Sequence, residues 1–413
     1  MHQKVPVHQK VPVHQSGVRE CPVPLTRIGL GLWVATLVAV VLGATSGESV
    51  LAVLHRTAPV LGFAVAITMV ADVAFRAGLF TSLAESLAGV LGRRAGGKRW
   101  VLFASVIAMA VVCTAFLSLD TTAVLLTPVV VLLAEHTRSA AMPFALATVW
   151  LANTASLTLP VSNLTNLLAS HRLGSPTPVT WLGWFGLPSL AAIVVTCVAL
   201  AWVSRRHVRG TFRLEDRTAT PDRALWLISA ITVAALLPVL LLPVAPWIPA
   251  TVAAVILLVA AATRRKVTQT NWKQPWKDVP WGLVVFASGL FVGADALEQS
   301  VLQHVKVPDL GTGALAAFAA AGAGLVGANV LDNLPAYLLL EPLARTDLAL
   351  KAVLVGVNVG PLITPWASLA TLLWHRQLGA LGVEVSWKRY IGWGAVVAPV
   401  AVAAATATLL IVN

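Results

Sequence analysis

Long apolar runs separated by short polar segments dominate the sequence. Crossing a bilayer takes about 20 helical residues at about 1.5 Å per residue, and nine of the runs reach this length. They begin near residues 24, 57, 141, 179, 224, 246, 281, 350 and 390. The pattern therefore predicts an all-α polytopic membrane protein.

Two further apolar segments, residues 100–136 and 311–345, are interrupted in the middle by polar residues. The interruptions are Asp120-Thr121-Thr122 and Asp332-Asn333-Leu334-Pro335. Polar residues and breaks at membrane depth are tolerated where the chain lines a protein or water cavity. We expect each segment to form a re-entrant helical hairpin with its polar tip at mid-membrane.

The predicted segments form two halves with one order of elements. Residues 57–204 hold a crossing, an amphipathic helix, the first hairpin and two crossings, and residues 281–413 repeat this order from the opposite side. An Asn and a Pro follow each hairpin at equal spacing, as Asn153 with Pro160 and Asn358 with Pro365. We expect two inverted repeats, each with a re-entrant helical hairpin and a broken transmembrane helix.

The remaining segments connect or precede these halves. Residues 1–27 begin with a Pro-rich HQKVPV repeat and predict a disordered N-terminal tail. Residues 28–56 are expected to form a first transmembrane helix and an outer loop. Residues 205–280 are expected to form basic cytoplasmic loops and a connecting helix pair.

Composition and charge support a membrane protein and set its orientation. The chain is 58% hydrophobic and 11% charged, with a mean hydropathy of +0.83, whereas soluble domains carry roughly 25% charged residues. With re-entrant hairpins, 24 of the 29 Lys and Arg residues lie on one side, which the positive-inside rule assigns to the cytoplasm. We expect a plasma (inner) membrane protein with a cytoplasmic N-terminus and an external C-terminus, and no nucleic-acid partner.

No pattern in the sequence predicts an enzyme, a metal centre or a cofactor. Cys21, Cys113 and Cys197 are far apart and form no C-x-x-C pair. The chain also lacks H-E-x-x-H, G-x-S-x-G and an acidic pair on one helix. We therefore expect a transporter that needs no cofactor.

Two hairpin tips and two helix breaks that meet at mid-membrane would form a small polar chamber. The broken helices would present free N–H and C=O groups there, with the helix dipoles behind them. No buried Lys or Arg is expected, so a small neutral hydroxylated solute or a monovalent one fits better than a multivalent anion. The side chains expected to bind this solute are Asp120, Thr121, Thr122, Asn153, Ser156, Ser162, Asn163, Asn333, Asn358, Thr364 and Ser368.

Asp120 and Asp332 are the candidate carriers of a coupling ion. A buried Asp at the bilayer centre costs about 2.5–3.5 kcal/mol, and neither hairpin has a Lys or Arg near its tip. Each carboxyl can therefore take up a proton or ligate a cation. The alternative is that each Asp only caps the returning helix of its hairpin, a role that is compatible with carrying a proton.

These segments resemble the arsenical pump membrane protein family, the arsenite and antimonite efflux permeases of the ion transporter superfamily. The likeness rests on residues 119–128, 153–166, 332–335 and 360–374, and it extends from about residue 50 to the end. The resemblance implies an elevator-type or rocking exporter of trivalent arsenite, driven by proton entry or coupled to a soluble ATPase subunit. A homodimer is left open.

Individual residues follow the family pattern only in part. Asp120 matches the acidic position of the first tip, and Asn163 and Ser368 match polar positions after the breaks. The family commonly has Asp where this chain has Asn153 and Asn358, Asn where it has Asp332, and Lys where it has Leu362. The resemblance therefore leaves the coupling ion open.

Our leading hypothesis is proton-coupled export of arsenite or antimonite. The alternative within the same superfamily is a Na⁺-coupled symporter of a carboxylate or other small anion, or a Na⁺/H⁺ antiporter. Helix breaks could serve any of these transporters, so the sequence does not separate them. A membrane enzyme or a structural scaffold does not account for matched polar breaks in both halves.

Overall fold

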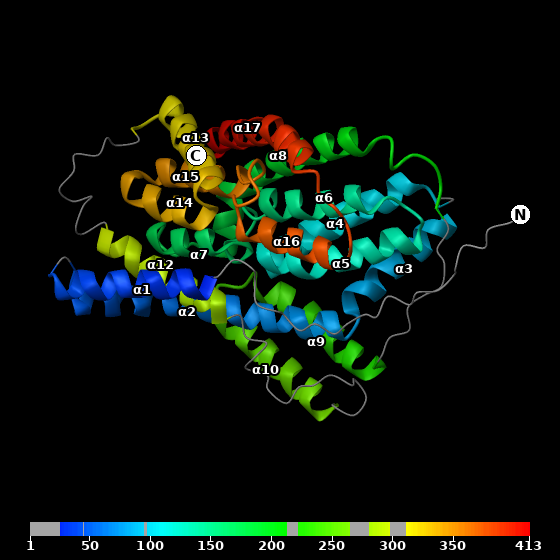
Figure 1. The fold of residues 1–413 in the computed structure, drawn as a ribbon, viewed down its shortest axis with the longest axis horizontal. Helices are drawn as coiled ribbons and strands as arrows, with labels where there is room; N and C mark the ends of the chain where they lie inside the picture. Colours follow the sequence, from blue (N-terminus) through cyan, green and yellow to red (C-terminus); the bar gives the residue numbers. More distant parts are fainter. Residues whose placement is uncertain (1–24, 44, 95–96, 213–221, 265–280, 298–310) are drawn as a thin grey trace, which may run out of the picture.

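The computed structural model describes residues 25–43, 45–94, 97–212, 222–264, 281–297 and 311–413. These residues form helices and no β-sheet (Figure 1). Five of these helices are long and apolar enough to cross a membrane. They are α2 (Gly47–Arg76), α4 (Arg99–Leu117), α5 (Leu119–His136), α8 (Pro178–Ser204) and α17 (Trp387–Val412). Further apolar helices are shorter. The helices without a sheet and their apolar character confirm the polytopic all-α membrane fold.

The N-terminal helices lie along one side of the molecule (Figure 1). The helix α1 (Leu25–Val41) packs against α12 (Trp281–Leu297), where Gly29 and Gly289 allow the two backbones to touch. The helix α2 begins at Gly47 after the N-cap Ser46, so the outer loop expected up to residue 56 is wrong for its last ten residues. Of the tail expected at residues 1–27, residues 1–24 lie outside the described part of the chain.

The first half, up to residue 204, is a series of helices with two interruptions. After α2 come α3 (Leu79–Arg94), α4 and α5, with Ser118 between α4 and α5 in the left-handed region at φ 78°. The helix α6 (Ala141–Thr154) then stops, and a short 3-10 turn, η1 (Pro160–Ser162), precedes α7 (Leu164–Arg172) and α8. Pro160 cannot donate a backbone hydrogen bond, which explains why the helix does not continue through it.

The second half has the same order of helices after α12. The helices α13 (Ala314–Val330) and α14 (Asn333–Leu340) flank Asp332, which has φ 149°, and η4 (Glu341–Leu343) follows. The helix α15 (Asp347–Val359) then stops before α16 (Leu369–Ala380) and α17. The outer-interface segment expected at residues 298–308 lies outside the described part of the chain.

The helix α6 lies in the middle of the molecule, packed against α4, α5, α8, α15 and α16 (Figure 1). It is buried from Pro143 to Thr154. On the side away from α1 and α2, α8 packs against α17 and α13 packs against α15. Gly356 is required at the α13–α15 contact, because a Cβ there would lie 2.1 Å from the carbonyl oxygen of Ala321.

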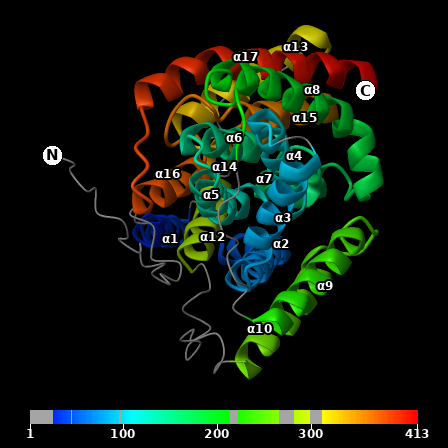
Figure 2. The same ribbon diagram turned by 90° about the vertical axis from the view of Figure 1, so that its right-hand side faces the viewer.

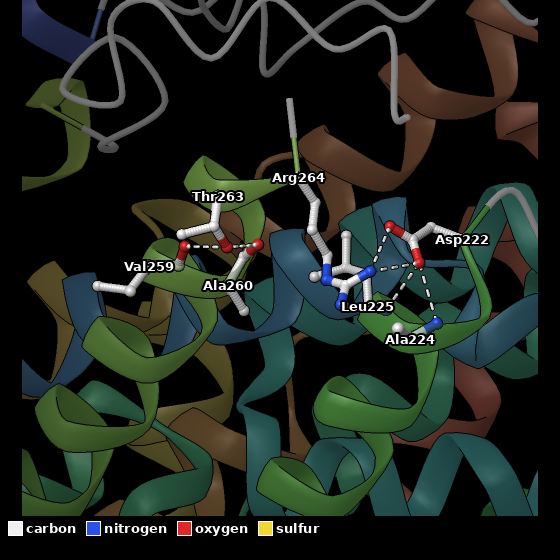
Figure 3. A network of polar contacts seen from close by, with 7 residues as sticks. All are labelled: Asp222, Ala224, Leu225, Val259, Ala260, Thr263 and Arg264. Carbon is white, nitrogen blue, oxygen red and sulfur yellow. Dashed lines mark hydrogen bonds and ion pairs between the residues drawn. The ribbon is translucent and has the colours of Figure 1, made fainter. Parts of the chain in front are cut away.

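The helices α9 (Arg223–Val239) and α10 (Trp247–Thr263) pack against each other and stand at the edge of the molecule beside α2 (Figure 2). Asp222 caps α9 by accepting from the backbone N–H groups of Ala224 (2.9 Å) and Leu225 (3.1 Å). Its carboxylate also pairs with Arg264 at the end of α10, at 3.4 Å (Figure 3). Partial burial raises the pKa of Asp222, but the two N–H groups and Arg264 together lower it below its ordinary value.

Candidate functional site

The two helix breaks meet in a buried network of amide and hydroxyl groups centred on Asn358, near the end of α15. The Asn358 Oδ1 atom accepts hydrogen bonds from Ser156 Oγ (3.0 Å), Thr165 Oγ1 (3.3 Å) and Asn163 Nδ2. All four residues are almost completely buried. The network therefore joins the break of the first half to the break of the second.

Asn166 completes this network and satisfies the broken backbone of the first half. Its Oδ1 accepts from Asn358 Nδ2 at 3.0 Å. Its Nδ2 donates to the carbonyl oxygens of Ser156 (2.7 Å) and Leu159 (2.9 Å), which the interrupted helix leaves without helical partners. Buried polar groups are stable only when paired, so Asn166 holds the break in shape.

The two breaks share their local geometry. Asn163 caps α7 by accepting from Thr165 N, and Ser368 caps α16 by accepting from Thr371 N, both at 3.3 Å. The backbone dihedrals of the two caps nearly coincide, with φ and ψ of −151° and 146° for Asn163 and −148° and 148° for Ser368. The break motifs that the sequence pairs by spacing therefore have matching backbone conformations.

Asn329 on α13 holds the break of the second half. Its Nδ2 donates to the carbonyl oxygen of Gly360 at 2.8 Å, and its Oδ1 accepts from the N–H groups of Ile363 and Thr364, each at 3.1 Å. The hydroxyl of Thr364 donates back to the Asn329 carbonyl oxygen at 2.7 Å. Thr364, a predicted solute ligand, is therefore bound to the hairpin beside it.

The polar residues of the first tip bind mainly to each other and to the break. Ser118 Oγ donates to Thr121 Oγ1 at 3.1 Å, and Thr122 Oγ1 donates to the Ser118 carbonyl oxygen at 2.9 Å. Ser162 Oγ, in the first break, donates to the carbonyl oxygen of Ala115 at the end of α4, at 2.7 Å. The bonds of the predicted ligands Thr121 and Thr122 therefore shape the tip, and the bond of the predicted ligand Ser162 fixes the tip against the break.

Asp120 lies beside a pocket between this tip, α2 and the first break. The pocket has a volume of about 20 Å³, which is room for about one water molecule. The Asp120 Oδ1 atom is buried and has no hydrogen-bond partner among the described residues. The lining residues are Phe63, Ala64, Ile67, Thr68, Ser118, Leu119, Asp120, Val161, Leu164 and Leu167. The second half contributes none of them, so this pocket is not the shared chamber that the sequence predicts.

The two tip carboxyls differ in their local roles. Asp332 is the N-cap of α14 and accepts from Leu334 N at 3.1 Å, as the capping alternative describes. Asp120 lies inside α5, whose N-cap is Ser118, so that alternative does not apply to it. Asp332 lies within electrostatic range of Asp120 and close to the backbone N–H of Leu369, at the start of α16. Asn333, the first residue of α14, is buried.

Comparison with known proteins supplies the family. A family model described as a citrate transporter, CitMHS, matches residues 23–371. The chain belongs to the CitMHS family. Among its curated relatives, an arsenical pump membrane protein of Escherichia coli is 26% identical over 338 residues, and one of Yersinia enterocolitica is 28% identical over 338 residues. Each alignment covers 74% of this chain and 76% of the relative.

Membership of the CitMHS family settles the class of the protein. It is a membrane transporter and not an enzyme, as the sequence predicts. The resemblance to arsenical pump membrane proteins is likewise confirmed. The proteins that carry this name are similar to the chain over most of their length, because the alignments cover 76% of each of these two relatives.

One expectation about charge in this CitMHS transporter is wrong. Lys351 is buried on α15, whereas no buried Lys or Arg is expected from the sequence. Its ammonium group lies 4.0 Å from the ring centroid of Trp184 and donates to Asn413 Oδ1. It precedes Asn358 by about two helical turns, or about 10 Å, and it takes no part in the hydrogen bonds that join Asn358 to the first half.

Several residues that shape the site escape the sequence analysis. Asn329 and Trp181 are the main examples: buried Trp181 on α8 donates from Nε1 to the Leu157 carbonyl oxygen in the first break, at 3.1 Å. A lone Asn in the apolar run before Asp332 is a signal that could have identified Asn329. Trp181 gives no such signal, because a Trp near the end of an apolar segment is equally typical of a membrane interface.

Proposed function

We propose that this protein is a secondary active transporter that exports arsenite and antimonite across the cytoplasmic membrane, driven by proton entry. The observation that carries the proposal is that the two helix breaks meet among buried neutral amides and hydroxyls, of which Asn153 Oδ1 accepts from no described residue. Such groups suit an uncharged hydroxylated solute, and arsenous acid is uncharged at neutral pH. The names of the curated relatives support the same substrate class.

The proposed architecture is a pair of inverted repeats, each with a re-entrant hairpin and a broken helix. The shared order of helices and the matching caps at Asn163 and Ser368 support it. The short helices α6 and α15, with 14 and 13 residues, are too short to span about 30 Å of hydrocarbon alone. With this arrangement we propose a cytoplasmic N-terminus and an external C-terminus, in the inner membrane.

Asp120 and Asp332 are the proposed proton carriers. Asp120 is the stronger candidate, because its Oδ1 has no hydrogen-bond partner in the described part of the chain and lies beside a pocket for one water molecule. A carboxyl group in such surroundings is stabilised by taking up a proton. Asp332 already accepts a hydrogen bond as the cap of α14, so its proton uptake would weaken that cap.

The test is arsenite export by a sensitive host whose own pump is deleted. Expression of the wild-type protein is expected to lower cellular arsenic, and Asp120→Asn is expected to abolish the effect without removing the protein from the membrane. Glu135→Gln is the matched control, because Glu135 is exposed at the far end of the same helix, α5. Unchanged arsenic content on expression of the wild type would contradict the proposal.

The second candidate function is Na⁺-coupled uptake of a carboxylate or another small anion, or Na⁺/H⁺ antiport. The description of the family as citrate transporters favours it. Reconstituted protein separates the candidates: citrate uptake that depends on Na⁺ would support the symporter, whereas arsenite transport that depends on a pH gradient supports the exporter. Co-purification tests a soluble ATPase subunit, and light scattering in detergent tests a homodimer.

A further inference from the structure

The two breaks have matching caps, but the asparagines that precede them differ in their hydrogen bonds. Asn153 and Asn358 occupy matching positions, and each donates from Nδ2 to the carbonyl oxygen four residues earlier, at 3.0 and 2.8 Å. Asn358 Oδ1 also accepts from three side chains of the first half. Asn153 Oδ1 is fully buried and accepts from no described residue.

The sequence of the second break explains the difference. Matching Asn153 to Asn358 places Pro361 opposite Ser156, Ser368 opposite Asn163 and Ala370 opposite Thr165. Pro and Ala carry no side-chain donor. Ser368 already contacts Thr371, with 3.0 Å between the two hydroxyl oxygens. The second half therefore provides no counterpart to the donors that bind Asn358.

Two more buried polar atoms without hydrogen bonds belong to residues whose rings lie close together. One is Nε1 of Trp150, one helical turn before Asn153 on α6, and the other is the hydroxyl of Tyr390 on α17. The Tyr390 hydroxyl faces Thr371 and Trp150 without reaching hydrogen-bond geometry, and the rings of Trp150 and Tyr390 are 6.4 Å apart. Because unpaired buried polar groups are unfavourable, such a cluster points to an external ligand.

We propose that Asn153, Trp150 and Tyr390 bind hydroxyl groups of the transported solute, whereas Asn358 is a structural lock between the two halves. This inference rests on the proposed function, because the solute is the one that is exported. A hydroxyl can donate to Asn153 Oδ1 and accept from Trp150 Nε1, and Tyr390 can do either. A carboxylate group has no proton for Asn153, and none of these three residues carries a positive charge to pair with it, so the site favours small uncharged hydroxylated solutes over citrate-like polyanions.

The first experiment measures arsenite uptake into everted vesicles that contain the full-length protein. Asn153→Leu is expected to raise the KM about tenfold or more, the effect of one lost hydrogen bond to a buried partner, and to leave the melting temperature nearly unchanged. Tyr390→Phe is expected to raise the KM severalfold. Tyr337→Phe is the matched control on α14, because Tyr337 is the other tyrosine of the chain and is also fully buried.

Asn358→Leu separates the two roles. It removes the partner of four side chains and is expected to lower the melting temperature more than Asn153→Leu does. The inference is wrong if Asn153→Leu and Tyr390→Phe both leave the KM for arsenite unchanged, or if Asn153→Leu destabilises the protein as much as Asn358→Leu.

A second measurement distinguishes failure of the inference from failure of the proposed function. The purified protein is heated with arsenite, boric acid or citrate. Stabilisation by arsenite and boric acid that Asn153→Leu removes supports the solute site, even if the wild type exports no arsenite. Stabilisation by citrate alone, or stabilisation that persists in Asn153→Leu, overturns it.

Discussion

Replacing Asn329 tests how the second break is held. Asn329→Leu keeps the approximate side-chain volume but leaves three backbone groups without their partner: the carbonyl of Gly360 and the N–H groups of Ile363 and Thr364. At about 1 kcal/mol for each lost hydrogen bond, the change destabilises the protein by about 3 kcal/mol. The loss of stability is expected to be larger if the three backbone groups stay buried, because no hydrogen bond then offsets the cost of removing them from water.

The assay is thermal unfolding of the purified protein in detergent at one fixed scan rate, since membrane proteins often unfold irreversibly. For a chain of 413 residues, a loss of about 3 kcal/mol corresponds to a fall of the melting temperature by about 3–4 °C. Asn329→Asp is expected to fall between the wild type and Asn329→Leu, because it keeps the acceptor for Ile363 and Thr364. Glu384→Leu is the control at an exposed site. If Asn329→Leu melts within about 1 °C of that control, Asn329 does not hold the break.

Three further predictions concern packing, the first break and the connecting pair. Gly356→Ala places a Cβ 2.1 Å from the Ala321 carbonyl oxygen and is expected to destabilise the protein by about 1–3 kcal/mol in thermal unfolding, whereas Gly186→Ala, which meets nothing within 4 Å, is not. Trp181→Phe strands the Leu157 carbonyl and is expected to lower the melting temperature, and Trp247→Phe at an exposed site leaves it unchanged. The lowered pKa of Asp222 means that its carboxylate stabilises the folded state above the ordinary value of 3.8, and that this contribution disappears as the pH falls through the lower folded value. The melting difference between wild type and Asp222→Ala is therefore expected to shrink below about pH 4; a difference that grows there would contradict this.

The order of helices and the places where they stop follow from the sequence, because polar interruptions and prolines in apolar runs have few structural solutions. Ser118, Pro160, Asp332 and Pro365 each lie at or beside an observed interruption. The beginning of α2 does not follow, since residues 47–56 carry enough polar side chains to be read as a loop, although Ser46 is a suitable N-cap.

The partners within the site could not be predicted. Ser156 and Asn358 are 202 positions apart, and no local pattern states which hydroxyl binds which amide. The unequal roles of Asn153 and Asn358 depend on what each break offers across the interface, so they emerge only when the two halves are packed together. Lys351 shows the same limit: its burial depends on Trp184 and Asn413, which are distant in the sequence.

The bonds at Asn358 restrict how the protein can move during a transport cycle. Four hydrogen bonds join this residue to the first half. Because all the partners are buried, water cannot easily replace these bonds when they break. Swinging one half away from the other would break all four together. Displacing both breaks as a single rigid piece, past α2 and the outer helices, would break none, which favours an elevator over a rocking hinge.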